Sequence, residues 1–140
     1  MVFLAFYKGP APTLTHKIAH HAVAWWTNSL YSHCELVVDG LCYSASARDN
    51  AVRLKNIDLT DGKWDLVPVR NVDVAFAKDH YEKTKYHSYD WAGVGRFVIP
   101  KLPLSDTRWY CSEWCAAALK FPEIEFSPET LCVYARYLLD

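Results

Sequence analysis

Two short segments of the sequence contain the residue types of a thiol-dependent hydrolase. In the first, Cys111 stands just before residues 114–119, an apolar and alanine-rich stretch that favours a helix. A helix that starts at Cys111 directs unpaired backbone N–H groups and the positive end of its dipole at the sulfur. Such an environment lowers the pKa of a thiol and supplies hydrogen-bond donors for an oxyanion.

The second segment places His33 at the start of a predicted strand, His33–Val38. On a regular strand, His33 and Glu35 point to one face and Cys34 points to the other. The carboxylate can then hold a ring nitrogen of the histidine by a hydrogen bond. Because cysteine, histidine and carboxylate are the parts of nucleophilic thiol catalysis, the candidate catalytic residues are Cys111, His33 and Glu35.

Neighbouring side chains offer alternatives to this assignment. Cys115 lies one helical turn after Cys111 on the same face, but only the first turn of a helix has unpaired N–H groups. Glu113 is a competing carboxylate, whose simpler role is a favourable charge in the first helical turn. Free cysteine is among the most buried residue types, so the remaining cysteines are predicted to pack in the core: Cys34, Cys42 and Cys132.

The histidines of a predicted helix over residues 13–26 could form a metal site. His16 and His20 have the i, i+4 spacing of a metal-binding pair, but such a pair needs a third ligand and usually a glutamate base. Neither accompanies them, so these histidines are predicted to be solvated or capping residues. The sequence therefore predicts neither a metal ion nor another cofactor.

Aromatic residues beside the catalytic candidates are predicted to bind the substrate. Trp109 and Tyr110 directly precede Cys111, and Tyr31 precedes the segment with the histidine. For most of the tryptophans Trp25, Trp26, Trp91 and Trp114, core packing is the default expectation.

The histidine precedes the cysteine, which is the reverse of the order in papain-like enzymes. Two segments resemble the circularly permuted papain-like group of the NlpC/P60 superfamily, especially its YiiX/YaeF-like branch. They are Ser32-His33-Cys34-Glu35, followed by apolar strand residues, and Tyr110-Cys111-Ser112-Glu113 at a helix start. Weaker similarities lie at residues 3–7, 89–91 and 127–131.

The resemblance implies a permuted papain-like fold in which Cys111 is the nucleophile, His33 the base and Glu35 the residue that orients the histidine. It also implies an acyl-group substrate, with a peptide or peptidoglycan amide first and a lipid ester second. Small proteins of this kind also occur in tailed phages, as distant relatives of cell-wall hydrolases.

Composition favours one globular domain over residues 1–140. The chain is 51% hydrophobic and 15% aromatic, enough for a single packed core. A net charge of −1 with scattered basic residues gives no footprint for nucleic acid. No membrane span and no signal peptide are expected. Five cysteines without CxxC spacing argue against a disulfide framework, so a cytoplasmic location is expected, or association with a virion if a phage encodes the chain.

The order of predicted elements indicates an α+β fold: a small antiparallel sheet or partial barrel with helices packed on one side. Strands are predicted at residues 2–7, 33–38, 41–44, 52–57 and 64–69, with Asp39-Gly40 as a hairpin turn. Helices are predicted at residues 13–26, 72–85, 89–98, 111–120 and 127–138, and a loop at residues 101–108.

The sequence therefore predicts a cysteine hydrolase that cleaves an amide or ester bond through a thioester intermediate. Its expected partner is a small acyl or peptide-type substrate, and a protein substrate or partner is compatible with the same chemistry. Two alternatives stay open. One is an acyltransferase or lipid esterase of the lecithin:retinol acyltransferase type, whose Asn-Cys-Glu-His box differs from Tyr-Cys-Ser-Glu here. The other is a non-catalytic protein that binds a partner in its cleft.

Overall fold

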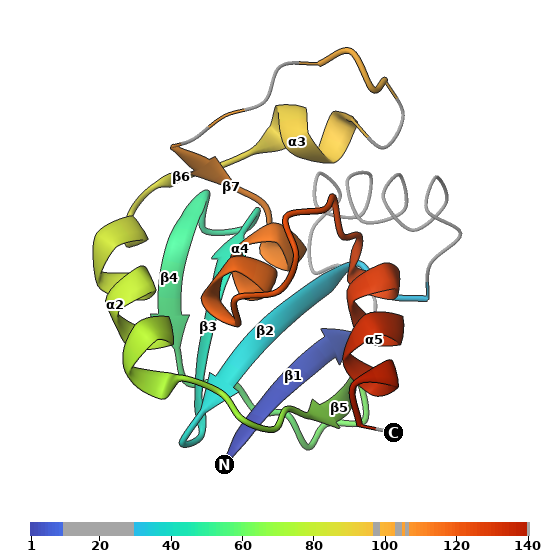
Figure 1. The fold of residues 1–140 in the computed structure, drawn as a ribbon. Helices are drawn as coiled ribbons and strands as arrows, with labels where there is room; N and C mark the ends of the chain where they lie inside the picture. Colours follow the sequence, from blue (N-terminus) through green and yellow to red (C-terminus); the bar gives the residue numbers. More distant parts are fainter. Residues whose placement is uncertain (10–29, 97–98, 103–104, 106, 140) are drawn as a thin grey trace.

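The structure, a computed structural model, describes residues 1–9, 30–96, 99–102, 105 and 107–139. Within these ranges seven strands form one sheet, accompanied by four helices, so the predicted α+β class is confirmed (Figure 1). The strands are β1 (Val2–Tyr7), β2 (His33–Val38), β3 (Leu41–Ser46), β4 (Ala51–Lys55), β5 (Trp64–Pro68), β6 (Ser88–Tyr89) and β7 (Arg108–Trp109). The helices are α2 (Val74–Thr84), α3 (Trp91–Gly95), α4 (Cys111–Ala118) and α5 (Pro128–Tyr137).

The strand order is β5-β1-β2-β3-β4-β6-β7. All neighbouring strands are antiparallel except β6 and β7, which run parallel. The predicted turn between β2 and β3 is confirmed: Asp39 and Gly40 have φ angles of 50° and 83°, both left-handed, as a type I′ hairpin requires. This hairpin fixes the register of β2, which carries His33 and Glu35.

Most predicted bounds agree with the structure to within two residues, but the segment before Cys111 differs. The sequence predicts a helix from Tyr89 and a loop through Arg108. Both assignments are wrong at these residues, since they lie in β6 and β7. Strands of two residues show no alternation in the sequence, and they form only because distant segments meet in the sheet. The helix predicted at residues 13–26 lies outside the described residues.

Three helices cover one face of the sheet. Helix α4 packs across β2 and β3, α5 packs on β1 and β5, and α2 contacts β4 and α4. Figure 1 shows α3 farther away, beyond the end of the sheet formed by β6 and β7. The main hydrophobic core lies between these helices and the sheet, and its largest fully buried side chains include Trp114, Phe6, Phe126 and Leu131.

The other face of the sheet carries a smaller apolar cluster around Val37 and Cys42. Because successive side chains of a strand alternate, Val37 lies opposite Leu36, which belongs to the main core. By the same alternation, Glu35 belongs to the face of the smaller cluster and Cys34 to the face of the helices. The strand β2 thus divides the candidate site residues between two layers.

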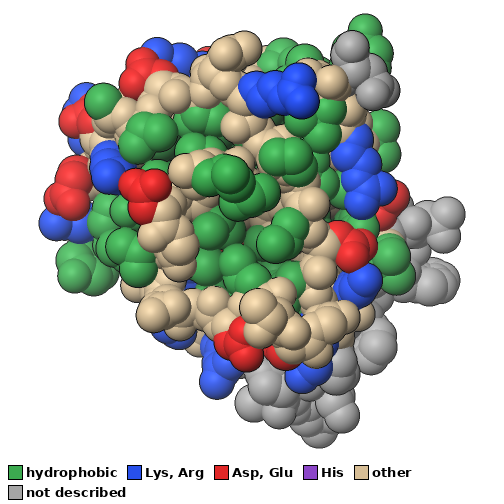
Figure 2. Space-filling model, turned by 90° about the horizontal axis from the view of Figure 1, so that it is seen from below, with side chains coloured by type: hydrophobic (Ala, Val, Ile, Leu, Met, Phe, Trp, Pro, Cys, Tyr) green, Lys and Arg blue, Asp and Glu red, His purple; other side chains and the backbone are tan. Residues whose placement is uncertain are grey.

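The surface shows no dominant charge on the face seen in Figure 2, where acidic and basic side chains are interspersed around an apolar centre. In the part of the chain that the structure describes, no helix has the length and hydrophobicity to cross a membrane.

Candidate active site

Helix α4 begins at Cys111, as predicted, with Tyr110 as its N-cap in extended backbone conformation. Tyr110 provides no side-chain cap. Instead, the Glu113 carboxylate accepts a hydrogen bond from the Tyr110 backbone N–H, which is the backward half of a capping box. Glu113 thus lies in the first helical turn, as the sequence indicates, but burial raises its pKa to about 7, so the favourable charge expected there is not what the structure favours. The Cys111 sulfur therefore lies at the positive end of the helix, and the residue is only 3% exposed.

His33 and Glu35 meet as the strand alternation predicts. Nε2 of His33 lies 2.6 Å from Oε1 of Glu35, whose side chain is fully buried. An ionised carboxylate only accepts hydrogen bonds, so the imidazole donates its Nε2–H to Glu35. This contact leaves Nδ1 as the ring nitrogen for the Cys111 thiol, with which His33 forms a hydrogen bond and an attractive charge pair.

Arg53 on β4 is a site residue that sequence reasoning missed. Its guanidinium donates two hydrogen bonds to Glu35, Nη1 to Oε2 at 2.7 Å and Nη2 to Oε1 at 2.5 Å. Nε of the same side chain donates to Asp49 at 3.0 Å, and Asp49 also accepts bonds from Lys55. A two-pronged arginine contact fixes both oxygens of the carboxylate and hence the direction in which Glu35 faces His33.

A small residue on β3 lets Arg53 reach Glu35. Ser44 pairs with Arg53 across β3 and β4, is fully buried, and donates its hydroxyl to the Cys34 carbonyl at 2.7 Å. Because β3 lies between β2 and β4, the short serine side chain leaves room for the guanidinium to pass over it. No local sequence signal marks Arg53, since its partner lies two strands away.

The charges of these groups support one another. Burial opposes the ionisation of Glu35, but the hydrogen bonds from Arg53 and the attraction of His33 outweigh it and lower the carboxyl pKa. Burial also opposes protonation of His33, but the charge of Glu35 and the hydrogen bonds to Cys111 and Glu35 raise the pKa of His33 to about 10.

The thiol of Cys111 responds to the same charges. Hydrogen bonds from the Cys34 thiol and from His33, together with the charge of His33, hold the pKa of Cys111 well below its usual range, against the effect of burial. The backbone N–H of Cys34 adds a further hydrogen bond to this sulfur. These shifts favour a thiolate–imidazolium pair over a neutral thiol beside a neutral imidazole.

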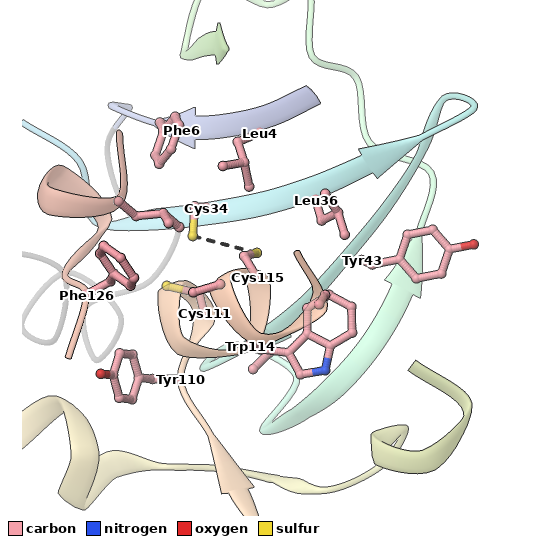
Figure 3. Close-up of a cluster of buried hydrophobic side chains, with 14 of the residues drawn as sticks. Leu4, Phe6, Cys34, Leu36, Tyr43, Tyr110, Cys111, Trp114, Cys115 and Phe126 are labelled. Carbon is pink, nitrogen blue, oxygen red and sulfur yellow. Dashed lines mark hydrogen bonds between the residues drawn. The ribbon is translucent and has the colours of Figure 1, made fainter. Parts of the chain in front are cut away.

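Two other cysteines border the Cys111 sulfur. Figure 3 shows Cys34, Cys111 and Cys115 with their sulfurs gathered where β2 faces α4. Cys34 and Cys115 are fully buried, and their Sγ atoms lie 3.9 Å apart. The core position predicted for Cys34 is confirmed. The Cys34 side chain lies on the face of β2 opposite Glu35. It nevertheless contacts the Cys111 thiol, as does its neighbour His33.

The three residues predicted to bind substrate lie within two residues of His33 or Cys111 in the sequence, but their side chains differ in solvent exposure. Tyr31 is 4% exposed and donates its hydroxyl to Asp65, and Tyr110 is 6% exposed. Trp109 is partly exposed, and its Nε1 donates to Nδ1 of His87 at 3.3 Å. Substrate binding by these residues stays a prediction.

Among the described residues, no group of three or more histidines, cysteines, aspartates and glutamates is arranged to hold a metal ion. His16 and His20 lie outside the described residues, so the structure does not bear on that pair.

A scan against protein-family models finds none that matches the chain, and a search of curated proteins finds no match. Function must therefore be inferred from the geometry and charge of the site.

Proposed function

We propose that the protein is a cysteine hydrolase with a permuted papain-like fold of the NlpC/P60 type. The observation that carries the proposal is the line of alternating charges that ends at a helix-start thiol: Arg53, Glu35, His33 and Cys111. A simple structural ion pair would not place an activated thiol beside an oriented imidazole. These are the elements of a thiol nucleophile with its base and orienting group.

In the proposed reaction, the Cys111 thiolate attacks the carbonyl carbon of an acyl substrate. The oxyanion that forms would be stabilised by the first backbone N–H groups of α4. The imidazolium of His33 then protonates the leaving amine or alcohol, which yields a thioester on Cys111. Neutral His33 next removes a proton from water, and the water oxygen attacks the thioester carbonyl. The C–S bond then breaks, the acid leaves, and the Cys111 thiolate and the His33 imidazolium are restored. Glu35 keeps the imidazole in one orientation throughout, and Arg53 keeps Glu35 ionised.

The substrate class follows from this chemistry and from the family resemblance. A thiolate with a general acid cleaves amides, isopeptides and esters, and we place peptide or peptidoglycan amides before lipid esters. Transfer of the acyl group to an acceptor other than water would use the same residues.

The test is formation of a covalent acyl-enzyme, because it needs no natural substrate. With p-nitrophenyl acetate we expect a burst of nitrophenol and an acetyl group on Cys111, located by fragmentation of tryptic peptide 109–120. Cys111→Ala should abolish the burst, and His33→Ala should slow it by about 10³-fold or more, as for other coupled catalytic residues. Cys115→Ala is the matched control and should retain the burst.

Acetylation at Cys115, or equal slow acetylation of several cysteines, would contradict the assignment. It would instead favour a non-catalytic protein that binds a partner, since such a protein has no need of an activated thiol.

A further inference from the structure

The Cys111 thiol lies beside two other cysteine thiols that have no covalent role in hydrolysis. Hydrolysis needs one thiol, but this site holds three buried free thiols: Cys34, Cys111 and Cys115. Cys34 lies on β2 and hydrogen-bonds to Cys111 at the start of α4. Helix α4 packs on β2, so the two thiols face each other across this contact (Figure 3), and a disulfide requires their sulfurs to close to about 2.05 Å.

We propose that Cys34 is the resolving cysteine of Cys111, so that peroxide converts this pair into a reversible disulfide between β2 and α4. The oxidant class is hydrogen peroxide or an alkyl hydroperoxide. The proposal goes beyond hydrolysis and depends only on a nucleophilic thiolate at Cys111.

The oxidation takes two steps. The Cys111 thiolate attacks one peroxide oxygen and the O–O bond breaks. The departing hydroxide, or the alkoxide of an alkyl hydroperoxide, takes the proton of the His33 imidazolium and leaves as water or as the alcohol. Cys111 is now a sulfenic acid. The Cys34 sulfur then attacks the Cys111 sulfur, the S–O bond breaks, and the hydroxyl leaves as water with the Cys34 thiol proton. In sum, two thiols lose two electrons and the peroxide gains them.

Cys115 is the rival partner, because its sulfur lies 3.9 Å from that of Cys34. Cys111 is favoured for the first step, since peroxide reacts with thiolates and the helix start and His33 stabilise the thiolate there. A disulfide with Cys34 would also prevent further oxidation of Cys111 to the irreversible sulfinic acid.

The pairing can be read by mass spectrometry. Trypsin leaves Cys34 and Cys42 in peptide 18–48 and Cys111 and Cys115 in peptide 109–120. In the double variant Cys42→Ser with Cys115→Ser, each peptide keeps a single cysteine, so a cross-link between them is unambiguous. After brief hydrogen peroxide treatment, alkylation of free thiols and digestion without reductant, we expect this cross-linked pair. Dithiothreitol should return both peptides.

A third substitution, Cys34→Ser in the same background, should remove the cross-link and leave Cys111 as sulfinic acid after more peroxide. If the double variant does not fold, fragment ions of the cross-linked peptides from wild type give the same pairing. A cross-link between Cys34 and Cys115 in wild type, or peroxide treatment that yields only sulfinic acid at Cys111, would overturn the proposal. Either result alongside an intact acetylation burst would leave the hydrolase proposal standing.

Discussion

Four side chains alternate in charge along the site: Arg53, Glu35, His33 and Cys111. Each is wholly or largely removed from solvent, so the charged form of each depends on the opposite charge of its neighbour. The charge on the sulfur is thus set partly by an arginine that never touches it. At the residue scale, the pKa of the Cys111 thiol therefore depends on all four of these side chains.

The pKa values of Cys111 and His33 predict a broad pH range for activity. A lowered thiol pKa keeps the thiolate as the pH falls, so alkylation by iodoacetamide should slow only in acid. A His33 pKa of about 10 keeps the imidazolium that protonates the leaving group, so hydrolysis should decline only as the pH rises through that value. The measurement is the alkylation rate of Cys111 against pH, followed by peptide mass spectrometry.

The control for this profile is the protein unfolded in urea, in which every cysteine should react as an ordinary thiol with a pKa of about 8.5. A folded protein whose Cys111 alkylation rises through that same pH would show that the thiolate is not stabilised.

At the scale of elements, β4 positions the carboxylate on β2 from two strands away. Replacing Arg53 by methionine should leave Glu35 without its two-pronged partner and should raise the pKa of the Cys111 thiol. Removal of one partner from a buried pair costs about 3–5 kcal/mol of stability. Arg53→Lys, which keeps the charge but not the two-pronged contact, is therefore the second variant. The measurement is the pH profile of Cys111 alkylation in each variant.

Lys55→Met is the matched control, because Lys55 lies on the same strand and binds the same Asp49, but the structure gives it no contact with Glu35. It should retain the wild-type profile. If Arg53→Lys and Lys55→Met both matched wild type, Arg53 would be a structural partner of Asp49 and not a positioning residue.

A second prediction at this scale concerns the carboxylate of Glu113, in the first turn of α4, and its effect on the stability of the fold. Burial raises its pKa to about 7, aided by Asp90 and Glu125 and opposed by the hydrogen bond from Tyr110. Because the folded-state pKa lies above the unfolded one, the contribution of this group to stability is fully present in acid and is lost as pH rises through about 7. Glu113→Gln should therefore raise the Tm at pH 8 and leave it unchanged at pH 4.

The amide oxygen of glutamine still accepts the Tyr110 N–H, so the cap itself is kept. The measurement is thermal unfolding by circular dichroism at both pH values. A Glu113→Gln variant that loses stability at pH 8 would show that the negative charge at the helix start outweighs its burial.

For the whole molecule, Trp114 joins the helical layer into one unit. Its ring is fully buried in the main core, and its Nε1 donates to Oγ1 of Thr84 on α2 at 2.8 Å. Trp114→Phe removes that bond and leaves a cavity, so we expect a loss of about 1–3 kcal/mol in the free energy of unfolding. Urea denaturation followed by circular dichroism measures it.

Trp91→Phe provides the comparison, because Trp91 lies on α3 and is 47% exposed. Its change should stay within about 0.5 kcal/mol. Equal losses in the two variants would mean that the core between the sheet and the helices does not dominate stability.

The sequence by itself determined the parts of this protein that depend on neighbours along the chain. The alternation of β2 placed His33 beside Glu35, the Asp39-Gly40 pair set the hairpin, and the apolar run after Cys111 set the start of α4. In each case the physical cause lies within a few residues, so the pattern is visible in the sequence.

Only the tertiary structure decided which distant residues meet. Arg53 reaches Glu35 because the register of three strands aligns them over a small serine, and Cys34 meets Cys111 because α4 packs across β2. The short strands β6 and β7 form because they pair with each other and because β6 also pairs with β4. These contacts arise from strand pairing and helix packing between segments far apart in sequence, and no local pattern records them.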